Sequence, residues 1–167
     1  SFATFDRKRN PSMVPALKRC MAVSSGRAWC ALLIGEYGTG KTHLAIAALN
    51  AWGLGRGIFW KVPDFLDWLR RMTFDRYIED PAAAYRIDPF LLVLDDLGAE
   101  NPTDWAHEQL YRLLDARQEW RLPTILTSNA APGAIDGRIV SRYHEGLYVC
   151  HGADVRRFDE AQAKGAS

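Results

Sequence analysis

The stretch GEYGTGKT, residues 35–42, decides how this 167-residue chain is interpreted. It follows the apolar run WCALLI (29–34) and precedes KTHLAIAALNAWG (41–53), which is rich in Ala and Leu and ends at a glycine. The order strand, glycine-rich loop and helix is typical of loops whose backbone N–H groups converge on phosphate oxygens beside a helix N-terminus. The fixed positions of the pattern G-x-x-x-x-G-K-[ST] are Gly35, Gly40, Lys41 and Thr42.

This loop predicts a nucleotide-binding site with defined roles for its side chains. Lys41 is expected to reach the β and γ phosphates of ATP, and the Thr42 hydroxyl is expected to ligate Mg²⁺. A chance match in a chain of this length is on the order of one in a few hundred, so a tight turn with an exposed lysine is the weaker alternative. The residues expected to contact the nucleotide are Gly35, Gly38, Thr39, Gly40, Lys41, Thr42 and His43.

Four further apolar runs predict strands. The runs are GIFWKV (57–62), FLLVLDDLG (90–98), LPTILTS (122–128) and LYVCHG (147–152). Apolar runs without polar alternation are typical of strands that are covered on both faces, as in parallel sheets. Helical patterns separate these runs, and this alternation predicts one three-layer α/β domain with a parallel sheet and right-handed crossovers.

The helical patterns have recognisable start signals. Pro63 suits a first helical turn, and Asn101 followed by Pro102 suggests an N-cap and a first-turn proline. The segment from Thr73 to Asp88 is less regular than the others. Helices are therefore expected from Pro63 onward, around Ile78 or Ala83, from Pro102 to about Trp120, and from Ala134 to Tyr143.

Composition excludes several classes of protein. The 21 basic and 20 acidic residues leave a formal charge of +1, so any contact with DNA must come from a local basic patch. Cys20, Cys30 and Cys150 form no C-x-x-C motif, and the latter two lie in apolar runs where reduced, buried thiols are expected. No apolar stretch approaches the roughly 18 residues that span a bilayer, and the chain is expected to be cytoplasmic.

Acidic and amide side chains follow two of the predicted strands. Asp95 ends the apolar run LLVL and is expected to hold Mg²⁺, directly or through water. Asp96 is placed to orient and deprotonate an attacking water. Asn129 follows the fourth strand, at the edge of the sheet where ligands of open α/β proteins bind, and is expected to reach the γ-phosphate or the water. Capping or surface acids and a turn asparagine are the structural alternatives.

Together these motifs resemble the AAA+ ATPases of the bacterial helicase-loader family, the DnaC and DnaI type, with the IstB transposition helpers as close relatives. The loop and the LDD strand are general to P-loop ATPases, whereas the match to this family rests on DDLGAE, TSN, RIVSRYHEG and GADVRR. The opening TFDRKRNPSMVPAL also looks like the start of the family's ATPase core. The resemblance implies the strand order 5-1-4-3-2, assembly into rings or spirals, and ATP sites shared between neighbouring subunits.

The resemblance also implies roles for individual residues. It makes Lys41 and Thr42 the Walker A pair, Asp95 and Asp96 the Walker B pair, and Asn129 the sensor 1 residue. Arg142 matches the arginine finger offered to the adjacent subunit, with Arg138 as the alternative, and Arg156 matches the sensor 2 arginine. A finger supplied in trans makes hydrolysis depend on assembly, because one subunit lacks the second cation for the γ-phosphate. For each arginine, a solvated side chain is the alternative.

Two departures from the family pattern affect these expectations. AAA+ proteins commonly have Glu as the second Walker B acid, and here Asp96 is shorter, which suggests slow turnover with Glu100 as the alternative base. The chain begins at Ser1, where the family's ATPase core begins, and has no substantial helical lid after Phe158. Residues 1–167 are therefore expected to form a single ATPase domain of a longer protein, without its amino-terminal helicase-binding domain.

A basic and aromatic segment follows the second strand. In the resembled family this region can carry an added helical element that meets single-stranded DNA. Arg70, Arg71 and Arg76 alternate here with Phe74 and Tyr77, a mixture suited to phosphate contact and base stacking. An amphipathic helix with its aromatic residues in the core and its arginines in water is the alternative.

Four functions are compatible with the sequence. The first is an ATP-dependent loader that deposits a replicative helicase on single-stranded DNA, and the second is an IstB-like helper of a transposase. A small P-loop kinase would need an acceptor pocket and an arginine-rich lid in cis, and no such insertion is evident. A nucleotide-gated binding module with negligible hydrolysis is the fourth.

Overall fold

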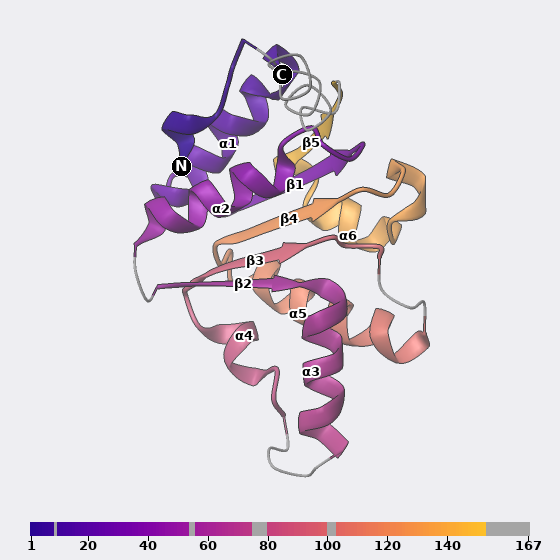
Figure 1. The fold of residues 1–167 in the computed structure, drawn as a ribbon. Coiled ribbons are helices and arrows are strands. Elements are labelled where there is room, and N and C mark those ends of the chain that lie inside the picture. Colours follow the sequence, from indigo (N-terminus) through magenta and orange to yellow (C-terminus); the bar gives the residue numbers. More distant parts are fainter. Residues whose placement is uncertain (9, 54–55, 75–79, 100–102, 153–167) are drawn as a thin grey trace, which may run out of the picture.

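A computed structural model describes residues 1–8, 10–53, 56–74, 80–99 and 103–152 (Figure 1). Five strands form one sheet in the order β2-β3-β4-β1-β5, and every recorded strand pair is parallel. The order 5-1-4-3-2 is therefore confirmed. The strands are β1 (Cys30–Gly35), β2 (Gly57–Lys61), β3 (Leu91–Asp95), β4 (Thr124–Ser128) and β5 (Leu147–Cys150).

Helices cover both faces of the sheet, as the apolar strands predict. Alternate residues of β1 enter different cores: Ala31 and Leu33 pack with α1 and α2, whereas Leu32 and Ile34 pack with α3, α5 and α6. The α-helices are α1 (Val14–Ser24), α2 (Lys41–Trp52), α3 (Val62–Phe74), α4 (Ala83–Ile87), α5 (Asp104–Glu119) and α6 (Gly137–Arg142). The 3-10 turns are η1 (Phe2–Thr4), η2 (Pro11–Met13), η3 (Pro132–Ala134) and η4 (His144–Gly146).

The predicted helix boundaries need three corrections. The N-cap of α5 is Thr103 rather than Asn101, because the Thr103 hydroxyl accepts a hydrogen bond from the backbone N–H of Ala106 at 3.2 Å. Asn101 and Pro102 lie outside the described residues. The helix expected over 134–143 is divided into η3 and α6, and Asp136 caps α6 by accepting from the Arg138 N–H. Val62 begins α3 instead of ending β2.

The cysteines and the helices of the described chain test two of the expectations that came from composition. The three cysteines are buried free thiols, and burial raises the pKa of Cys20 to about 12 and the pKa values of Cys30 and Cys150 to about 11. The expectation of reduced, buried thiols is confirmed. None of the described helices combines the length and the apolar character that crossing a bilayer requires.

Arg117 of α5 is a buried cation that holds the loops before β3 and β4. Its guanidinium donates to the carbonyls of Tyr85, Phe90 and Pro123 at 2.6, 2.8 and 2.8 Å. Nε also donates to the Thr124 hydroxyl at 3.0 Å. Burial lowers the Arg117 pKa to about 10. Five N–H donors in a planar fork allow one arginine side chain to satisfy more main-chain acceptors than the three donors of a lysine can.

Arg117→Ala is expected to lower the free energy of unfolding by about 3–5 kcal/mol, because several buried carbonyl groups lose their hydrogen bonds. Urea denaturation measures this change. Arg112→Ala is the control, since Arg112 is exposed on the same helix and its removal is expected to change stability by about 0.5 kcal/mol or less. Equal stability of the two variants would contradict the proposed structural role of Arg117.

Candidate nucleotide-binding site

The glycine-rich loop connects β1 to α2, and its backbone requires glycine at defined positions. A Cβ atom on Gly35 would lie 2.0 Å from the carbonyl oxygen of Cys150, so β5 could not approach β1 as it does. Gly38 and Gly40 have φ values of 77° and 100°, in the left-handed region that glycine adopts readily. Gly40 is the N-cap of α2, so the loop leads directly to the positive end of the helix.

Lys41 lies inside this loop. The residue is only 4% exposed, and its ammonium group donates to the carbonyls of Gly35 and Glu36 at 2.8 and 2.7 Å. It also contacts the hydroxyl of Thr39 at 3.3 Å. The loop thus wraps around the ammonium group and holds one positive charge among its backbone groups.

The side chains expected to hold Mg²⁺ meet at the tips of β3 and α2. The Thr42 hydroxyl donates to Asp95 Oδ1 at 2.9 Å, and the Thr127 hydroxyl donates to the same oxygen at 2.5 Å. A hydroxyl and a carboxylate next to a phosphate-binding loop fit Mg²⁺, which takes hard oxygen ligands from one or two protein groups, phosphate and water. The donor set therefore fits the predicted metal.

Asp96 and Asn129 form a second pair beside the first. Asp96 has a φ of 62°, which is uncommon for a residue other than glycine, and this turn separates its carboxylate from that of Asp95. Its backbone N–H donates to the Thr127 hydroxyl at 3.2 Å, and Asn129 Nδ2 donates to Asp96 Oδ1 at 2.5 Å. The ends of β3 and β4 therefore orient one carboxylate and one amide together.

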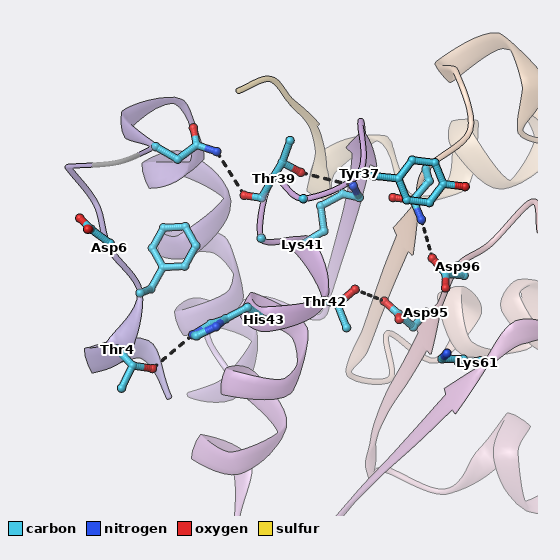
Figure 2. Close-up of a pocket in the computed structure, with 15 residues that line it drawn as sticks. Thr4, Asp6, Tyr37, Thr39, Lys41, Thr42, His43, Lys61, Asp95 and Asp96 are labelled. Atoms are coloured by element: carbon cyan, nitrogen blue, oxygen red, sulfur yellow. Dashed lines mark hydrogen bonds between the residues drawn. The ribbon is translucent and has the colours of Figure 1, made fainter. Parts of the chain in front are cut away.

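Apart from Thr127, the side chains of these two pairs line one pocket of about 630 Å³ together with Lys41 (Figure 2). It contains most of the side chains predicted for the site, whereas Gly35 takes part through its carbonyl bond to Lys41. The predicted residues that line it are Gly38, Thr39, Gly40, Lys41, Thr42, His43, Asp95, Asp96 and Asn129. The residues that sequence reasoning missed are Thr4, Phe5, Asp6, Asn10, Tyr37 and Lys61.

Most of the missed residues belong to the amino-terminal segment, which packs over the loop. Asn10 donates to the Thr39 carbonyl at 3.1 Å, and the Phe5 and His43 rings meet edge to face with centroids 5.8 Å apart. Because Phe5 and Asn10 lie far from the loop in the sequence, no local pattern predicted these contacts. Lys61 ends β2 and pairs in register with Asp95, beside which Figure 2 shows it. The predicted strand order could have indicated Lys61, because it places β2 beside β3 and neighbouring parallel strands end at the same edge of the sheet.

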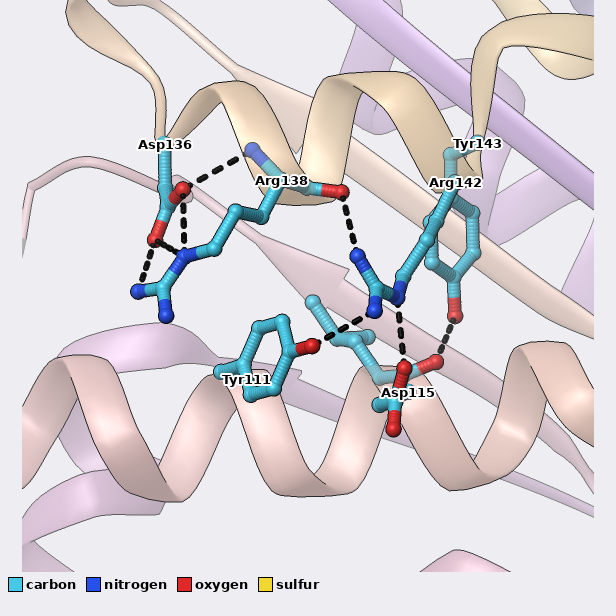
Figure 3. A network of polar contacts seen from close by, with 7 residues as sticks. Tyr111, Asp115, Asp136, Arg138, Arg142 and Tyr143 are labelled. Carbon is cyan, nitrogen blue, oxygen red and sulfur yellow. Dashed lines mark hydrogen bonds and ion pairs between the residues drawn. The ribbon is translucent and has the colours of Figure 1, made fainter.

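Arg138 and Arg142 lie on α6 (Figure 3), and neither is among the described residues that line the pocket of the same chain. Arg142 donates to Asp115 Oδ1 and to the Tyr111 hydroxyl, both at 2.5 Å. Arg138 pairs with Asp136 at 2.6 Å, and this bond lowers the pKa of the Asp136 carboxyl. The two guanidinium carbons lie 4.5 and 4.7 Å from the centroid of the Tyr111 ring. Arg156 and Glu100 are outside the described residues.

The arginines predicted to meet DNA are only partly described. Arg70 is exposed and its guanidinium carbon lies 5.1 Å from the Trp105 ring centroid, while Arg71 is exposed near the end of α3. Arg76 and Tyr77 are outside the described residues. Phe65, Leu66 and Leu69 form the buried face of α3. The helix is therefore amphipathic, as the structural alternative requires, and its exposed arginines remain available for contact.

Two relatives at the sequence level have different cellular settings. The chain is 31% identical to the replicative helicase loader DnaI of Bacillus subtilis over 103 residues, which are 60% of this chain and 33% of DnaI. It is 33% identical over 138 residues to ATP-binding protein Rv3427c of an insertion sequence in Mycobacterium tuberculosis, with 79% of this chain and 54% of that protein covered. The chain thus spans about half or less of the length of these relatives.

Solved structures extend the similarity to the fold. A crystal structure of the DnaC helicase loader matches with a TM-score of 0.77 and 26% identity, covering 90% of this chain and 96% of that one. A structure of the replication initiator DnaA bound to AMPPCP and single-stranded DNA matches with a TM-score of 0.79 and 22% identity, covering 98% and 53% of the two chains. The similarity to DnaA shows only that the two chains share the P-loop AAA+ fold.

The family match covers most of the chain and includes the pocket. Residues 3–137 match the IstB-like ATP-binding proteins, so the match contains the glycine-rich loop, the β3 acids and Asn129. It also includes the amino-terminal segment that packs over the loop. The chain therefore belongs to the family of IstB-like ATP-binding proteins.

Proposed function

We propose that this chain binds ATP with Mg²⁺ and hydrolyses it, as the ATPase core of a helicase loader that acts on single-stranded DNA. The observation that carries the proposal is the arrangement of five hydrogen-bonded residues beside the phosphate loop. Thr42 contacts Asp95, Thr127 contacts both Asp95 and the Asp96 backbone, and Asn129 contacts Asp96. In this proposal Asp95 ligates the metal and Asp96 activates the water.

Each part of the site has a physical task in hydrolysis. The loop N–H groups, the α2 N-terminus and Lys41 bind the triphosphate, which brings the γ-phosphate toward the β3 acids. Thr42 and Asp95 would hold Mg²⁺, which neutralises charge on the β and γ phosphate oxygens when it is bound. Asp96 accepts the proton of the attacking water, and Asn129 keeps that carboxylate oriented.

The amino-terminal segment has a different task from the loop and the acids, which is to bind the nucleoside end of ATP. Phe5 contacts the far side of the loop, since a Cβ on Gly40 would lie 3.0 Å from its ring. Its ring and that of His43 line the pocket and give an aromatic wall suited to a base.

The remaining cation for the γ-phosphate comes from a neighbouring subunit. Arg142 and Arg138 lie outside the pocket of their own chain, so either reaches an ATP only across an interface. Arg142 has three recorded hydrogen-bond acceptors, Asp115, Tyr111 and the Arg138 carbonyl. Acting as the finger would require it to leave them, whereas Arg138 has the more exposed side chain, 58% against 28%.

ATP hydrolysis per molecule is expected to rise with protein concentration, because the finger acts in trans. Arg142→Ala alone is expected to bind ATP but to hydrolyse it at least tenfold more slowly. Mixing it with Lys41→Ala, which retains an intact finger, restores part of the activity. Phosphate release measures each rate. Arg138→Ala is the matched variant, and rescue of that variant but not of Arg142→Ala would identify Arg138 as the finger. Lack of rescue in both mixtures contradicts action in trans.

The exposed arginines of α3 provide a contact for single-stranded DNA in this proposal. Arg70 is held by its contact with Trp105, and Arg71 lies one position further along the helix. Both project from a helix whose other face is buried, so phosphate contact requires no opening of the core.

A second candidate is a transposase helper, and one observation favours it. The similarity to the insertion-sequence protein extends over 138 residues, further than the 103 residues matched in DnaI. Both candidates use the same pocket and differ in the protein that the ATP-bound assembly recognises. Co-elution of the full-length protein with purified helicase, but not with transposase, in the presence of ATP would support the loader over the helper.

A further inference from the structure

A second pocket, of about 470 Å³, lies at the opposite edge of the sheet from the phosphate loop. Its lining comes from α1, the loop before β1, the turn before β4 and η4 before β5. Because the strands are parallel, these segments lie at the amino ends of the strands, and the length of β1 separates them from the nucleotide pocket by about 20 Å. The side chains that shape it are Arg19, Arg27, Trp29, Arg121, Pro123 and Glu145.

This pocket concentrates positive charge in a protein whose net charge is only +1. Among the described residues that line it, Glu145 is the one acid, with Oε1 3.6 Å from Arg19 Nη2 and 3.3 Å from Arg121 Nη1. Arg27 donates from Nε to the neutral Ser25 hydroxyl. One carboxylate among three guanidinium groups leaves two positive charges uncompensated within the lining, which favours an anionic ligand.

Aromatic surfaces lie beside these charges. Trp29 is 9% exposed and forms part of the lining, with the Arg121 guanidinium carbon 5.7 Å from its ring centroid and Tyr143 packed against it. Trp120 immediately precedes Arg121 and is 68% exposed. An exposed indole one residue before Arg121 in the chain offers base stacking close to a phosphate contact.

We propose that this pocket and Trp120 form a binding site for single-stranded nucleic acid. The backbone phosphates meet Arg19, Arg27 and Arg121, and a base stacks on Trp120. A phosphorylated peptide would use the same charges, but it gives no reason for the exposed indole. The site needs no nucleotide, so the proposal goes beyond the ATPase function and is tested separately from it.

Arg121→Gly tests the charge with little risk to the fold. Arg121 has a φ of 49° at the end of α5, a conformation that glycine adopts readily, so the variant removes the guanidinium and keeps the turn. Anisotropy of a fluorescein-labelled oligothymidylate is expected to show about tenfold weaker binding, with a salt dependence of log K less steep by about 0.7. Glu145→Gln is expected to strengthen binding about threefold, because it releases two arginines from their shared acid.

Trp120→Leu separates stacking from charge. It is expected to weaken binding about tenfold while leaving the salt dependence unchanged. Arg112→Ala removes an exposed charge elsewhere on α5 and is expected to leave affinity within about twofold. Wild-type affinity in both Arg121→Gly and Trp120→Leu would overturn the proposal. It would also be overturned if Arg121→Gly lost only the binding of a phosphoserine peptide, because that result assigns the pocket to a protein partner.

Discussion

Lys41→Ala is expected to weaken ATP binding by about a hundredfold or more. In the described structure the ammonium group lies inside the loop, bonded to the Gly35 and Glu36 carbonyls, so the loop already places a cation at the phosphate-binding position. Loss of two charge-assisted contacts to phosphate corresponds to about 3–6 kcal/mol, which is a factor of a hundred to ten thousand in affinity. Calorimetric titration with a non-hydrolysable ATP analogue measures the change.

The control for this prediction must separate lost affinity from lost folding. Lys18→Ala removes an exposed lysine from α1, outside the pocket lining, and is expected to bind ATP as the wild type does. Thermal unfolding of both variants shows whether the substitution in the loop destabilises the whole domain. Nucleotide affinity of folded Lys41→Ala within threefold of wild type would contradict the assigned role and, with it, the proposed ATPase.

Asp96→Asn is expected to slow ATP hydrolysis by about a hundredfold to ten thousandfold while leaving ATP affinity within about threefold. The amide has the size of the carboxylate, and its oxygen can still accept the hydrogen bond from Asn129 that is 2.5 Å long in the native chain. The substitution therefore removes the proton acceptor and keeps the geometry. Single-turnover phosphate release measures the chemical step separately from binding.

Glu108→Gln is the matched control, because Glu108 is an exposed acid of α5 that does not line the pocket. It is expected to hydrolyse ATP at the wild-type rate. Wild-type turnover in Asp96→Asn, together with loss of turnover in Glu100→Gln, would transfer the role of base to Glu100. Loss of ATP binding in Asp96→Asn would instead indicate that the carboxylate supports the loop.

Much of the sheet could be predicted because its signals are local. The five strands lie in the expected runs, since each run is apolar on both faces and ends at glycine or a polar residue. Helix boundaries were less predictable: Asn101-Pro102 and Thr103 both offer start signals, and the structure uses the Thr103 hydroxyl. The helix α1 carried no prediction, although four of its residues are buried against the sheet.

The candidate site likewise has one part that local patterns predict and another that depends on contacts between distant residues. The pattern GEYGTGKT and the LDD strand predict a loop and two acids, and the strand order brings them to one edge of the sheet. The contact between Asn10 and the loop links residues 29 positions apart, and no local pattern reports it. The side-chain partners of Arg142 lie on another helix, so the sequence could suggest that arginine's role without showing what holds it.

By itself, the sequence determined the chemistry of this protein: a phosphate-binding loop, acids at a strand end and the order in which strands and helices alternate. These properties depend on residues that are neighbours along the chain, where spacing and side-chain type act directly on the backbone. Only the tertiary structure decided that the amino-terminal segment lines the nucleotide pocket, that Arg117 is buried among carbonyls, and that three arginines and Trp29 line a second pocket at the amino ends of the strands. Packing of distant segments sets these contacts, because burial and hydrogen bonding are satisfied by the whole fold.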